Sequence, residues 1–190
     1  ILEEFIEGRH FNVDMVFING EAFKAGITER YFFDNIDHQA LSGIQGGCFD
    51  DVDIIQLYNV VIKACEVLGF NYGPVTADII VQDNKPYIIE ISPHFHAISI
   101  SSLIGLENIL KGWFMYLSSD SKWRSYMMVK PKEYAGYFYI LSNNEGTIIE
   151  IEGLDLIKAM PSFIDLDLKY VRGSRIKKNG NKQIYCGMAL

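Results

Sequence analysis

The fold of this chain is decided by residues 73–97, GPVTADIIVQDNKPYIIEISPHFHA. Two apolar runs flank the turn formers Asp83-Asn84-Lys85-Pro86, a pattern that predicts a β-hairpin with a short loop. A hairpin centred on Asn84 places Asp78 opposite Glu90. Directly opposed side chains have Cβ atoms about 5 Å apart, and like charges there destabilise the sheet unless something offsets them. A bound divalent cation would provide that offset.

The residues around the two acids are apolar. Asp78 lies between Val75-Thr76-Ala77 and Ile79-Ile80-Val81, and Glu90 lies within Tyr87-Ile88-Ile89 and Ile91. Such runs predict strands that are buried on both faces. Acids in an alternating hairpin usually belong to a solvated face, whereas buried carboxylates need a partner. The pair is therefore either a solvated face or half of a metal-nucleotide site, and the flanking residues favour the second.

Three blocks of sequence carry a resemblance to a known family. They are Leu2-Glu3-Glu4-Phe5-Ile6-Glu7-Gly8, the stretch Lys63–Phe70 followed by Gly73 and Ala77-Asp78, and Pro86–His94. In order and separation they resemble the hinge strand, helix and metal-binding strand of ATP-grasp ligases, the superfamily of biotin carboxylase, carbamoyl-phosphate synthase and D-alanine–D-alanine ligase. The resemblance covers residues 1 to about 110 and implies the C-terminal large lobe of that fold, an α+β structure with a mainly antiparallel sheet flanked by helices.

The resemblance implies a role for several residues. Asp78 and Glu90 would hold Mg²⁺, or Mn²⁺, against the ATP triphosphate, as hard oxygen ligands do. Glu3 would accept from the adenine amino group, and the backbone of Glu4 and Ile6 would bind the ring edge, although Glu3 and Glu4 also fit an ordinary solvated strand end. In the resembled enzymes ATP phosphorylates a carboxylate, and an amine or another nucleophile attacks the acyl phosphate; the metal neutralises charge as the phosphoryl group moves.

Departures from the family pattern concern four positions. His10 stands where an acid often binds the ribose hydroxyls, and Ser92 stands where Asn is common in the metal-binding turn. His94 stands where Arg is common, near the reacting phosphoryl group, and a histidine offers neither a permanent charge nor a bidentate fork. His94 and His96 are either a further metal site or exposed turn residues.

Composition limits the classes of function. The chain has 190 residues, 49% of them hydrophobic, which is enough for a sizeable core. A net charge of −7 without a basic run excludes nucleic acid as the expected partner. The sequence has no apolar run long enough for a membrane span and no secretory leader. Three scattered cysteines, Cys48, Cys65 and Cys186, are expected to be free thiols in a reducing cytoplasm.

Local patterns predict the remaining elements in two domains, residues 1–120 and a small β-rich subdomain over residues 121–190. Asn19-Gly20 predicts a two-residue hairpin turn, and a mobile loop is expected over residues 31–47. Helices are expected from Asp50 to Leu68, with Gly69 as C-cap, from Ser99 to Leu117, and from Gly153 to Ala159. Strands are expected over residues 1–6, 11–18, 21–28, 134–142, 147–152, 163–170, 176–178 and 184–190.

Two functions remain as hypotheses. The first is part of an ATP-dependent carboxylate-amine ligase that acts on small-molecule carboxylate and amine substrates. The second is a degenerate module of the same fold that binds nucleotide or a partner without catalysis, which Ser92 and His94 suggest. The chain begins at Ile1, inside the hinge-like block, so we expect an inactive fragment whose partner is the upstream part of the same enzyme. The identity of the joined substrates and the oligomeric state stay open.

Overall fold

The computed structural model describes residues 2–32, 40–46, 49–95, 107–127, 134–178 and 183–190. The chain forms two compact units, Ile1–Arg30 with Ile44–Ala135, and Tyr31–Gly43 with Gly136–Leu190. The sequence patterns suggested a boundary near residue 120, whereas the second unit begins at residue 136 and also takes up residues 31–43.

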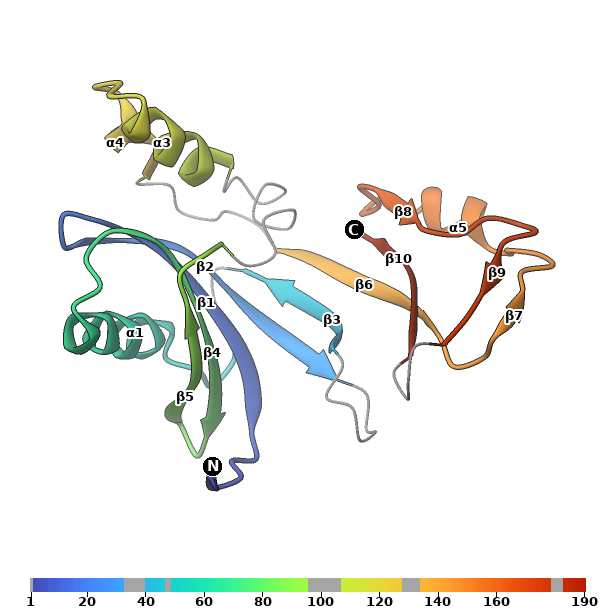
Figure 1. Cartoon of the computed structure of the whole chain (residues 1–190), viewed down its shortest axis with the longest axis horizontal. Coiled ribbons are helices and arrows are strands. Elements are labelled where there is room, and N and C mark those ends of the chain that lie inside the picture. The colour runs from blue at the N-terminus through green and yellow to red at the C-terminus, as the bar shows by residue number, and fades with distance from the viewer. Residues whose placement is uncertain (1, 33–39, 47–48, 96–106, 128–133, 179–182) are drawn as a thin grey trace. The chain divides into compact units, whose positions relative to one another are not determined.

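The first unit is built on four antiparallel strands in the order β5-β4-β1-β2 (Figure 1). The second unit contains strands in the order β3-β6-β10-β8 and a separate ladder of β7 with β9. This confirms the expected α+β class with a mainly antiparallel sheet. The elements are β1 (Arg9–Ile18), β2 (Glu21–Phe32), β3 (Ala40–Gln45), α1 (Ile54–Leu68), β4 (Gly73–Gln82), β5 (Lys85–Ser92), α3 (Glu107–Leu117), α4 (Trp123–Met127), β6 (Ala135–Ser142), β7 (Gly146–Thr147), α5 (Leu154–Lys158), β8 (Leu166–Leu168), β9 (Arg175–Ile176) and β10 (Ile184–Ala189).

Two-residue turns close both hairpins of the first unit. Asn19 and Gly20 join β1 to β2 with φ values of 53° and 84°, as the sequence predicted. Asp83 and Asn84 join β4 to β5 with φ values of 50° and 61°. Positive φ at both central residues matches the right-handed twist of the flanking strands, which is why such turns are favoured in hairpins.

The register of the β4-β5 hairpin depends on a β-bulge. The turn pairs Gln82 with Lys85, and this register continues to Ile79 opposite Ile88. Continued further, it would pair Asp78 with Ile89, but a shift between Asp78 and Ile79 inserts Ile89 as an extra residue and pairs Asp78 with Glu90. The expected pairing of the two acids is therefore confirmed, while the expected symmetry about Asn84 is wrong.

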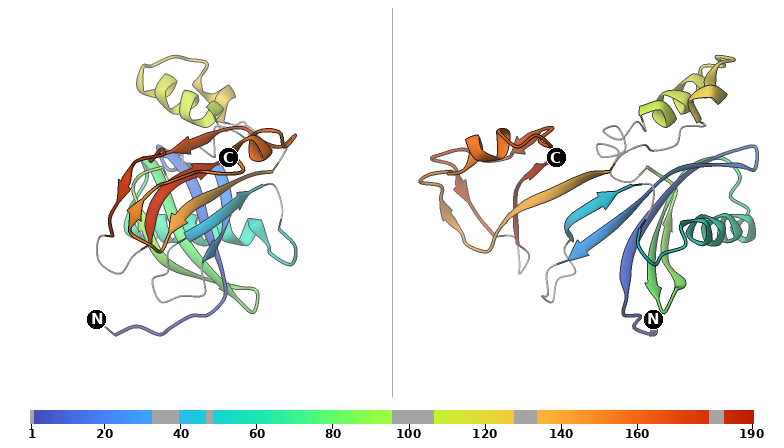
Figure 2. Two further views of the ribbon diagram at one scale, coloured as in Figure 1. Left: turned by 90° about the vertical axis from the view of Figure 1, so that its right-hand side faces the viewer. Right: turned by 180° about the vertical axis from the view of Figure 1, so that it is seen from behind.

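The two faces of this sheet differ because side chains alternate along each strand. The face covered by α1, here called the α1 face, is apolar and packs against Leu57, Val61 and Cys65 of the helix (Figures 1 and 2). The opposite face, here called the polar face, carries polar side chains along the middle of the strands. By register these are His10, Asn12, Asp14, Thr28, Arg30, Thr76, Asp78, Glu90 and Ser92.

Helix α1 ends at the signal expected from sequence, but it begins at Ile54, after the expected start at Asp50. The side chain of Asp53 accepts hydrogen bonds from the backbone N–H groups of Ile55 and Gln56, and Gly69 ends the helix in the left-handed conformation with φ 69°. Leu68, expected on the buried side, is 68% exposed, because the last turn extends past the sheet-facing residues.

Helices α3 and α4 contact the turn end of the β1-β2 hairpin through aromatic rings. Trp123 packs edge-on against Phe23 with ring centroids 5.7 Å apart, and Trp113 lies 5.3 Å from Tyr72. Arg124 pairs with Glu21 of β2 at 2.5 Å. The second half of the expected helix over residues 99–117 is thus confirmed as α3, its first half lies outside the described residues, and α4 was not predicted.

Four expectations about strands and loops are wrong. Residues 2–6 of the expected strand over residues 1–6 pair with no strand in the described part of the chain, and Leu2 and Phe5 are largely exposed. Residues 147–152 form a ladder only at Thr147, and the expected strand over residues 163–170 shrinks to β8. Part of the expected loop over residues 31–47 is β3, while residues 33–39 and 47 lie outside the described residues.

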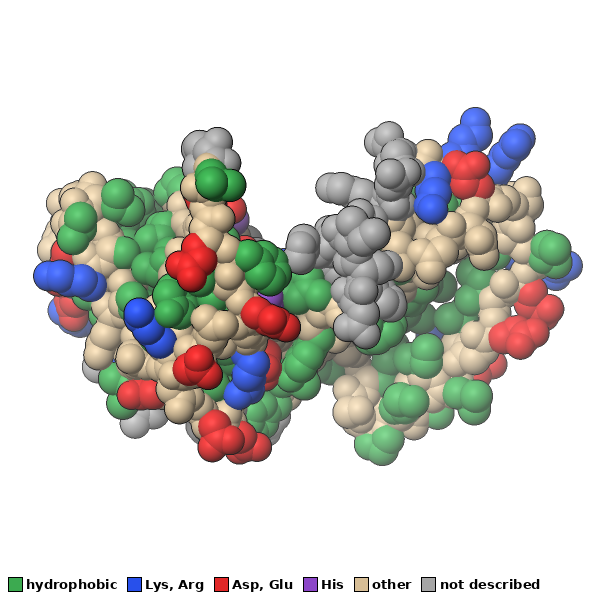
Figure 3. Space-filling view, turned by 90° about the horizontal axis from the view of Figure 1, so that it is seen from below, with side chains coloured by type: hydrophobic (Ala, Val, Ile, Leu, Met, Phe, Trp, Pro, Cys, Tyr) green, Lys and Arg blue, Asp and Glu red, His purple; other side chains and the backbone are tan. Residues whose placement is uncertain are grey.

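The structure shows how charged side chains and thiols are distributed over the described residues. On the face of the first unit drawn in Figure 3, basic side chains are interspersed with acidic ones instead of forming a patch. Cys65 is buried and Cys186 is partly exposed, both as free thiols, and Cys48 lies outside the described residues. Among the helices in the described ranges, none has the length and apolar content that a bilayer crossing requires.

Candidate nucleotide and metal site

The centre of the candidate site is a row of polar side chains across the polar face. Glu90 of β5 pairs with Asp78 of β4, Asp78 with Asn12 of β1, and Asn12 with Thr28 of β2. Residues paired across antiparallel strands share a face, so these four side chains lie on the same side of the sheet. Asn12 and Thr28 are almost fully buried.

Asp78 is held by two donors from neighbouring strands. The amide Nδ2 of Asn12 donates a hydrogen bond to Oδ1 of Asp78. The guanidinium of Arg30 donates to Oδ2 at 3.2 Å. Since each carboxylate oxygen has its own donor, the orientation of Asp78 is fixed while 40% of its side chain stays exposed.

Glu90 is oriented by its own strand. The hydroxyl of Ser92 donates to Oε1 of Glu90 at 2.5 Å. The expectation that Glu90 is buried on both faces is wrong, because β5 is the last strand of the sheet and Glu90 is exposed. An acid at that position stays accessible to a ligand.

The donor set fits a hard divalent cation. Mg²⁺ binds through one or two protein carboxylates and takes its other ligands from water and nucleotide phosphates. Within the described ranges, no third His, Cys, Asp or Glu joins Asp78 and Glu90 in a metal-binding cluster. Asn12 Oδ1, Thr28 Oγ1 and Thr76 Oγ1 are buried on the same face without a hydrogen-bond partner among the described residues. Buried polar atoms of that kind normally bind water or a ligand.

The structure places the other predicted site residues before β1, on β1 and in the turn after β5. Glu3 and Glu4 are exposed and Ile6 is half-buried in the segment before β1, and no described contact joins them to the carboxylate pair. His10 is half-buried on the polar face, paired with Arg30 and Ile80.

The turn after β5 carries the remaining residue. His94 is exposed, its backbone N–H donates to the Ser92 carbonyl at 3.0 Å, and its ring Nδ1 lies 2.9 Å from the carbonyl oxygen of Phe95. His96 lies outside the described residues, so the suggested second metal site stays a prediction.

Two residues of the site were missed by the sequence analysis, Asn12 and Arg30. A signal existed in the strand FNVDMVF, where polar Asn12 and Asp14 alternate with apolar residues, and in Thr28 and Arg30 two residues apart. Alternation shows that a strand has a polar face. The sequence does not show which strands lie beside β1. Only the strand order shows that β1 lies between β2 and β4, so that its polar side chains meet those of both strands.

A charge on the polar face also affects the α1 face. Burial, and then the negative charge of Asp14, raise the pKa of Tyr58 on α1 well above its ordinary value. Lys24 lies 4.9 Å from the centre of the same ring. The phenol of Tyr58 is therefore kept neutral.

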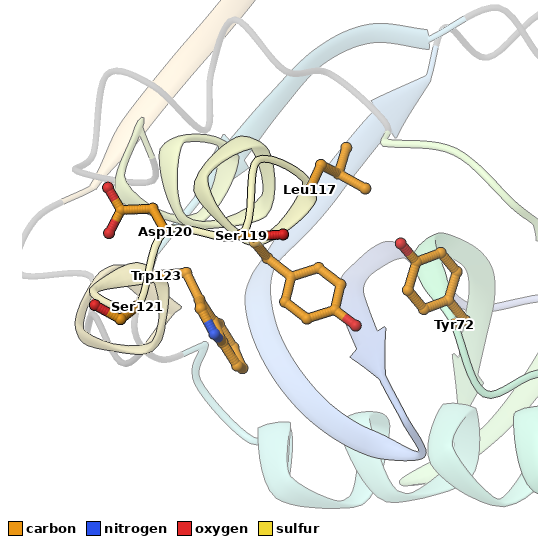
Figure 4. A pocket seen from close by; sticks show the side chains of 7 residues that line it. Tyr72, Leu117, Ser119, Asp120, Ser121 and Trp123 are labelled. Carbon is orange, nitrogen blue, oxygen red and sulfur yellow. The ribbon is translucent and has the colours of Figure 1, made fainter.

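A separate pocket of about 350 Å³ lies beside α3 and α4 (Figure 4). The ring of Tyr116 lies next to both Tyr72 and Trp123, with ring centroids 6.0 Å and 5.1 Å apart. Its lining residues are Tyr72, Tyr116, Leu117, Ser119, Asp120, Ser121 and Trp123. None of the predicted site residues lines this pocket.

Comparison with known proteins places this geometry in a family. A family model described as the ATP-grasp domain matches residues 1–98. An uncharacterized protein, y4rH, of Sinorhizobium fredii is 24% identical over 98% of this chain and 37% of its own length. The chain thus spans well under half the length of that curated relative.

Solved structures share the fold. The L-amino acid ligase of Bacillus licheniformis superposes with a TM-score of 0.74 at 22% identity over 97% of this chain and 48% of its own. The phosphoribosylglycinamide synthetase of Anaerococcus prevotii gives 0.70 at 20% identity over 98% and 48%. A biotin carboxylase–β-γ-ATP complex from Campylobacter jejuni gives 0.58 at 14% identity over 98% and 43%. Since the family model covers more than half of the 190 residues, the chain belongs to the ATP-grasp domain family.

Proposed function

We propose that this chain supplies the nucleotide and metal half-site of an ATP-dependent carboxylate-amine ligase that works through an acyl phosphate. The observation that carries the proposal is the pairing of Asp78 with Glu90, on the polar face of an ATP-grasp sheet. Similarity of fold to an L-amino acid ligase and to a phosphoribosylglycinamide synthetase supports a ligase of this general kind.

The roles follow from the contacts of each side chain. Asp78 and Glu90 would hold Mg²⁺, whose charge would offset that of the transferred phosphoryl group. Ser92 keeps Glu90 turned along its strand, and Asn12 keeps Asp78 turned toward the same face. Orientation of ligands by neighbouring donors is what maintains metal affinity in such sites.

The adenosine would lie toward the segment before β1. Gly8 approaches the backbone of Val81 so closely that an added Cβ would lie 2.2 Å from the Val81 carbonyl oxygen, which places Gly8, at the end of this segment, beside β4. Ile80 is the apolar residue of β4 that follows Asp78 on the polar face, and it would pack on the purine. Glu3 would accept from the adenine amino group, the backbone of Glu4 and Ile6 would bind the ring edge, and His10 would contact the ribose.

His94 is the residue on which the second candidate function rests. Its ring Nδ1 lies close to the Phe95 carbonyl oxygen, and the Ser92 hydroxyl already donates its hydrogen bond to Glu90. These contacts favour a module that binds Mg-ATP without transferring the phosphoryl group. In the ligase, His94 would instead turn toward the phosphoryl group and the small-molecule carboxylate, before the amine attacks.

Calorimetric titration with ATP, with and without Mg²⁺, tests the half-site. We expect Mg²⁺-dependent binding that Glu90→Gln weakens by at least tenfold, because one of two opposed carboxylates is removed. Glu66→Gln, an exposed acid on α1, is the matched control and should bind as the wild type does. Equal Mg²⁺-dependent affinity of wild type and Glu90→Gln would reject the carboxylate pair as the metal site.

Activity of the intact enzyme with His94→Arg would then separate the two candidate functions. The ligase should lose turnover with this substitution, whereas the decayed module should gain it.

A further inference from the structure

The strongest feature without an assigned role is Arg30. It lies on β2, and β1 separates it from β4. Neighbouring strands are about 4.8 Å apart, so the side chains of Arg30 and Asp78 together bridge roughly 10 Å across the polar face. Its guanidinium lies 3.2 Å from Asp78 Oδ2, and only 19% of the side chain is exposed. The charge is thus held over the sheet and not released to solvent.

The position of Arg30 matters because Asp78 faces another acid. Two opposed carboxylates repel one another, and the guanidinium offsets part of that repulsion. A divalent cation would need the same oxygens, and two cations a few ångströms apart repel strongly. Arg30 and the metal are therefore competitors for Asp78.

Asn12 makes such an exchange feasible. Its Nδ2 donates to Oδ1 of Asp78, whereas Arg30 binds Oδ2. Loss of the Arg30 contact would leave the Asn12 contact in place, so the carboxylate would keep its orientation while Oδ2 changes partner.

We propose that Arg30 is the counter-cation of Asp78 in the metal-free protein, and that metal binding to Asp78 redirects its guanidinium to the phosphates of the bound nucleotide. The proposal rests on the function proposed above. A guanidinium is permanently charged and binds phosphate through two parallel N–H groups. Arg30 would thereby supply the fork that His94 cannot offer.

The test uses two titrations of the 190-residue chain, Mn²⁺ alone and ATP with Mg²⁺. In Arg30→Gln we expect Mn²⁺ alone to bind about fivefold more tightly, since a competing charge is gone, and Mg-ATP to bind about tenfold more weakly, since a phosphate contact is gone. Arg30→Lys, which restores the charge, should return Mn²⁺ affinity toward that of the wild type. Arg124→Gln, which breaks the exposed Glu21 pair, is the control and should change neither affinity.

The opposite signs of the two effects distinguish this role from a structural one. A folding defect in Arg30→Gln would weaken both ligands, and thermal unfolding would reveal it; Arg30→Met, which keeps an unbranched aliphatic stem, then replaces Gln. Unchanged or weaker Mn²⁺ binding in a folded neutral variant would overturn the proposal. Failure of the wild type to bind Mn²⁺ or Mg-ATP would instead overturn the proposed function itself, so the two failures differ.

Discussion

The α1 face and the polar face of the β5-β4-β1-β2 sheet share one backbone but differ in what their side chains contact. On β1 the odd-numbered residues Phe11 and Val13 are buried in the core with α1, whereas Asn12, between them, donates to a carboxylate. On β4, Ala77 and Ile79 pack in the core, and Asp78 lies on the other face. Alternate residues of the same strands therefore contribute to stability or to binding. A substitution should change mainly the stability if it lies on the α1 face, and mainly the binding if it lies on the polar face.

The largest effect on stability is expected on the α1 face. Leu57→Ala removes a side chain that is 1% exposed, and should lower the free energy of unfolding by about 2–5 kcal/mol through lost burial and a cavity. Urea unfolding followed by circular dichroism measures it. The control is Leu68→Ala on the same helix, 68% exposed, which should cost less than about 0.5 kcal/mol. Similar losses of stability in both variants would contradict the burial of Leu57 and the exposure of Leu68.

An effect that depends on metal is expected on the polar face. Asn12→Asp adds a third carboxylate to the row and should lower the free energy of unfolding by on the order of 2 kcal/mol. Millimolar Mg²⁺ should recover part of this loss, which thermal unfolding with and without Mg²⁺ detects. Asn12→Ala removes the donor without adding charge and keeps Asp78 and Glu90, so Mg²⁺ should stabilise it less than it stabilises Asn12→Asp. Absence of a Mg²⁺ response in both variants would argue against a cation site in this row.

A smaller effect should connect the two faces at alkaline pH. The pKa of Tyr58 is raised by burial and by Asp14, so the neutral phenol contributes stability that is complete below its ordinary value of 10.0 and is lost as pH rises above it. Urea titrations between about pH 8 and 11 should show a steeper alkaline decline for the wild type than for Tyr58→Phe. Asp14→Asn should reduce the difference, and identical slopes in wild type and Tyr58→Phe would contradict the coupling.

The smallest effect is expected at a turn that belongs to neither face. Asn84 has φ 61°, a conformation that glycine adopts without strain, so Asn84→Gly should stabilise the hairpin by about 0.5 kcal/mol. Thermal unfolding checks the gain, and Mg-ATP affinity should not change. A change in nucleotide affinity would show that the turn and the site are linked through the register.

The sequence predicted hairpins and helix ends well because their signals are local. Asn19-Gly20 and the Gly69 cap each act within a few residues, and both were found in the structure, whereas the Asp53 N-cap was not predicted. The pairing of Asp78 with Glu90 was also predicted, but it depends on the inserted residue Ile89. The residue types in a run such as Tyr87–Ile91 do not indicate where an extra residue is inserted. The assumption of a symmetric hairpin therefore predicted the correct pair from an incorrect register.

What the sequence could not provide is the neighbour of each strand. Residues 2–6 look like a strand but have no partner within the described ranges, and a strand without a partner leaves its backbone groups unpaired. Likewise, apolar residues around Glu90 suggested burial, although β5 ends the sheet. Arg30 was missed for the same reason, since its contact crosses a strand that is distant in sequence.

The place of β5 at the end of the sheet has a consequence for solubility. A strand with one unpaired edge can recruit the edge of another molecule, and proteins prevent this with proline, charge and bulges. Strand β5 has all three, with Pro86, Lys85 and Glu90 as side chains and Ile89 as the bulge. Glu90, which is proposed to bind metal, therefore also opposes edge-to-edge association of two molecules. Its removal would delete a metal ligand and increase the tendency of the protein to aggregate.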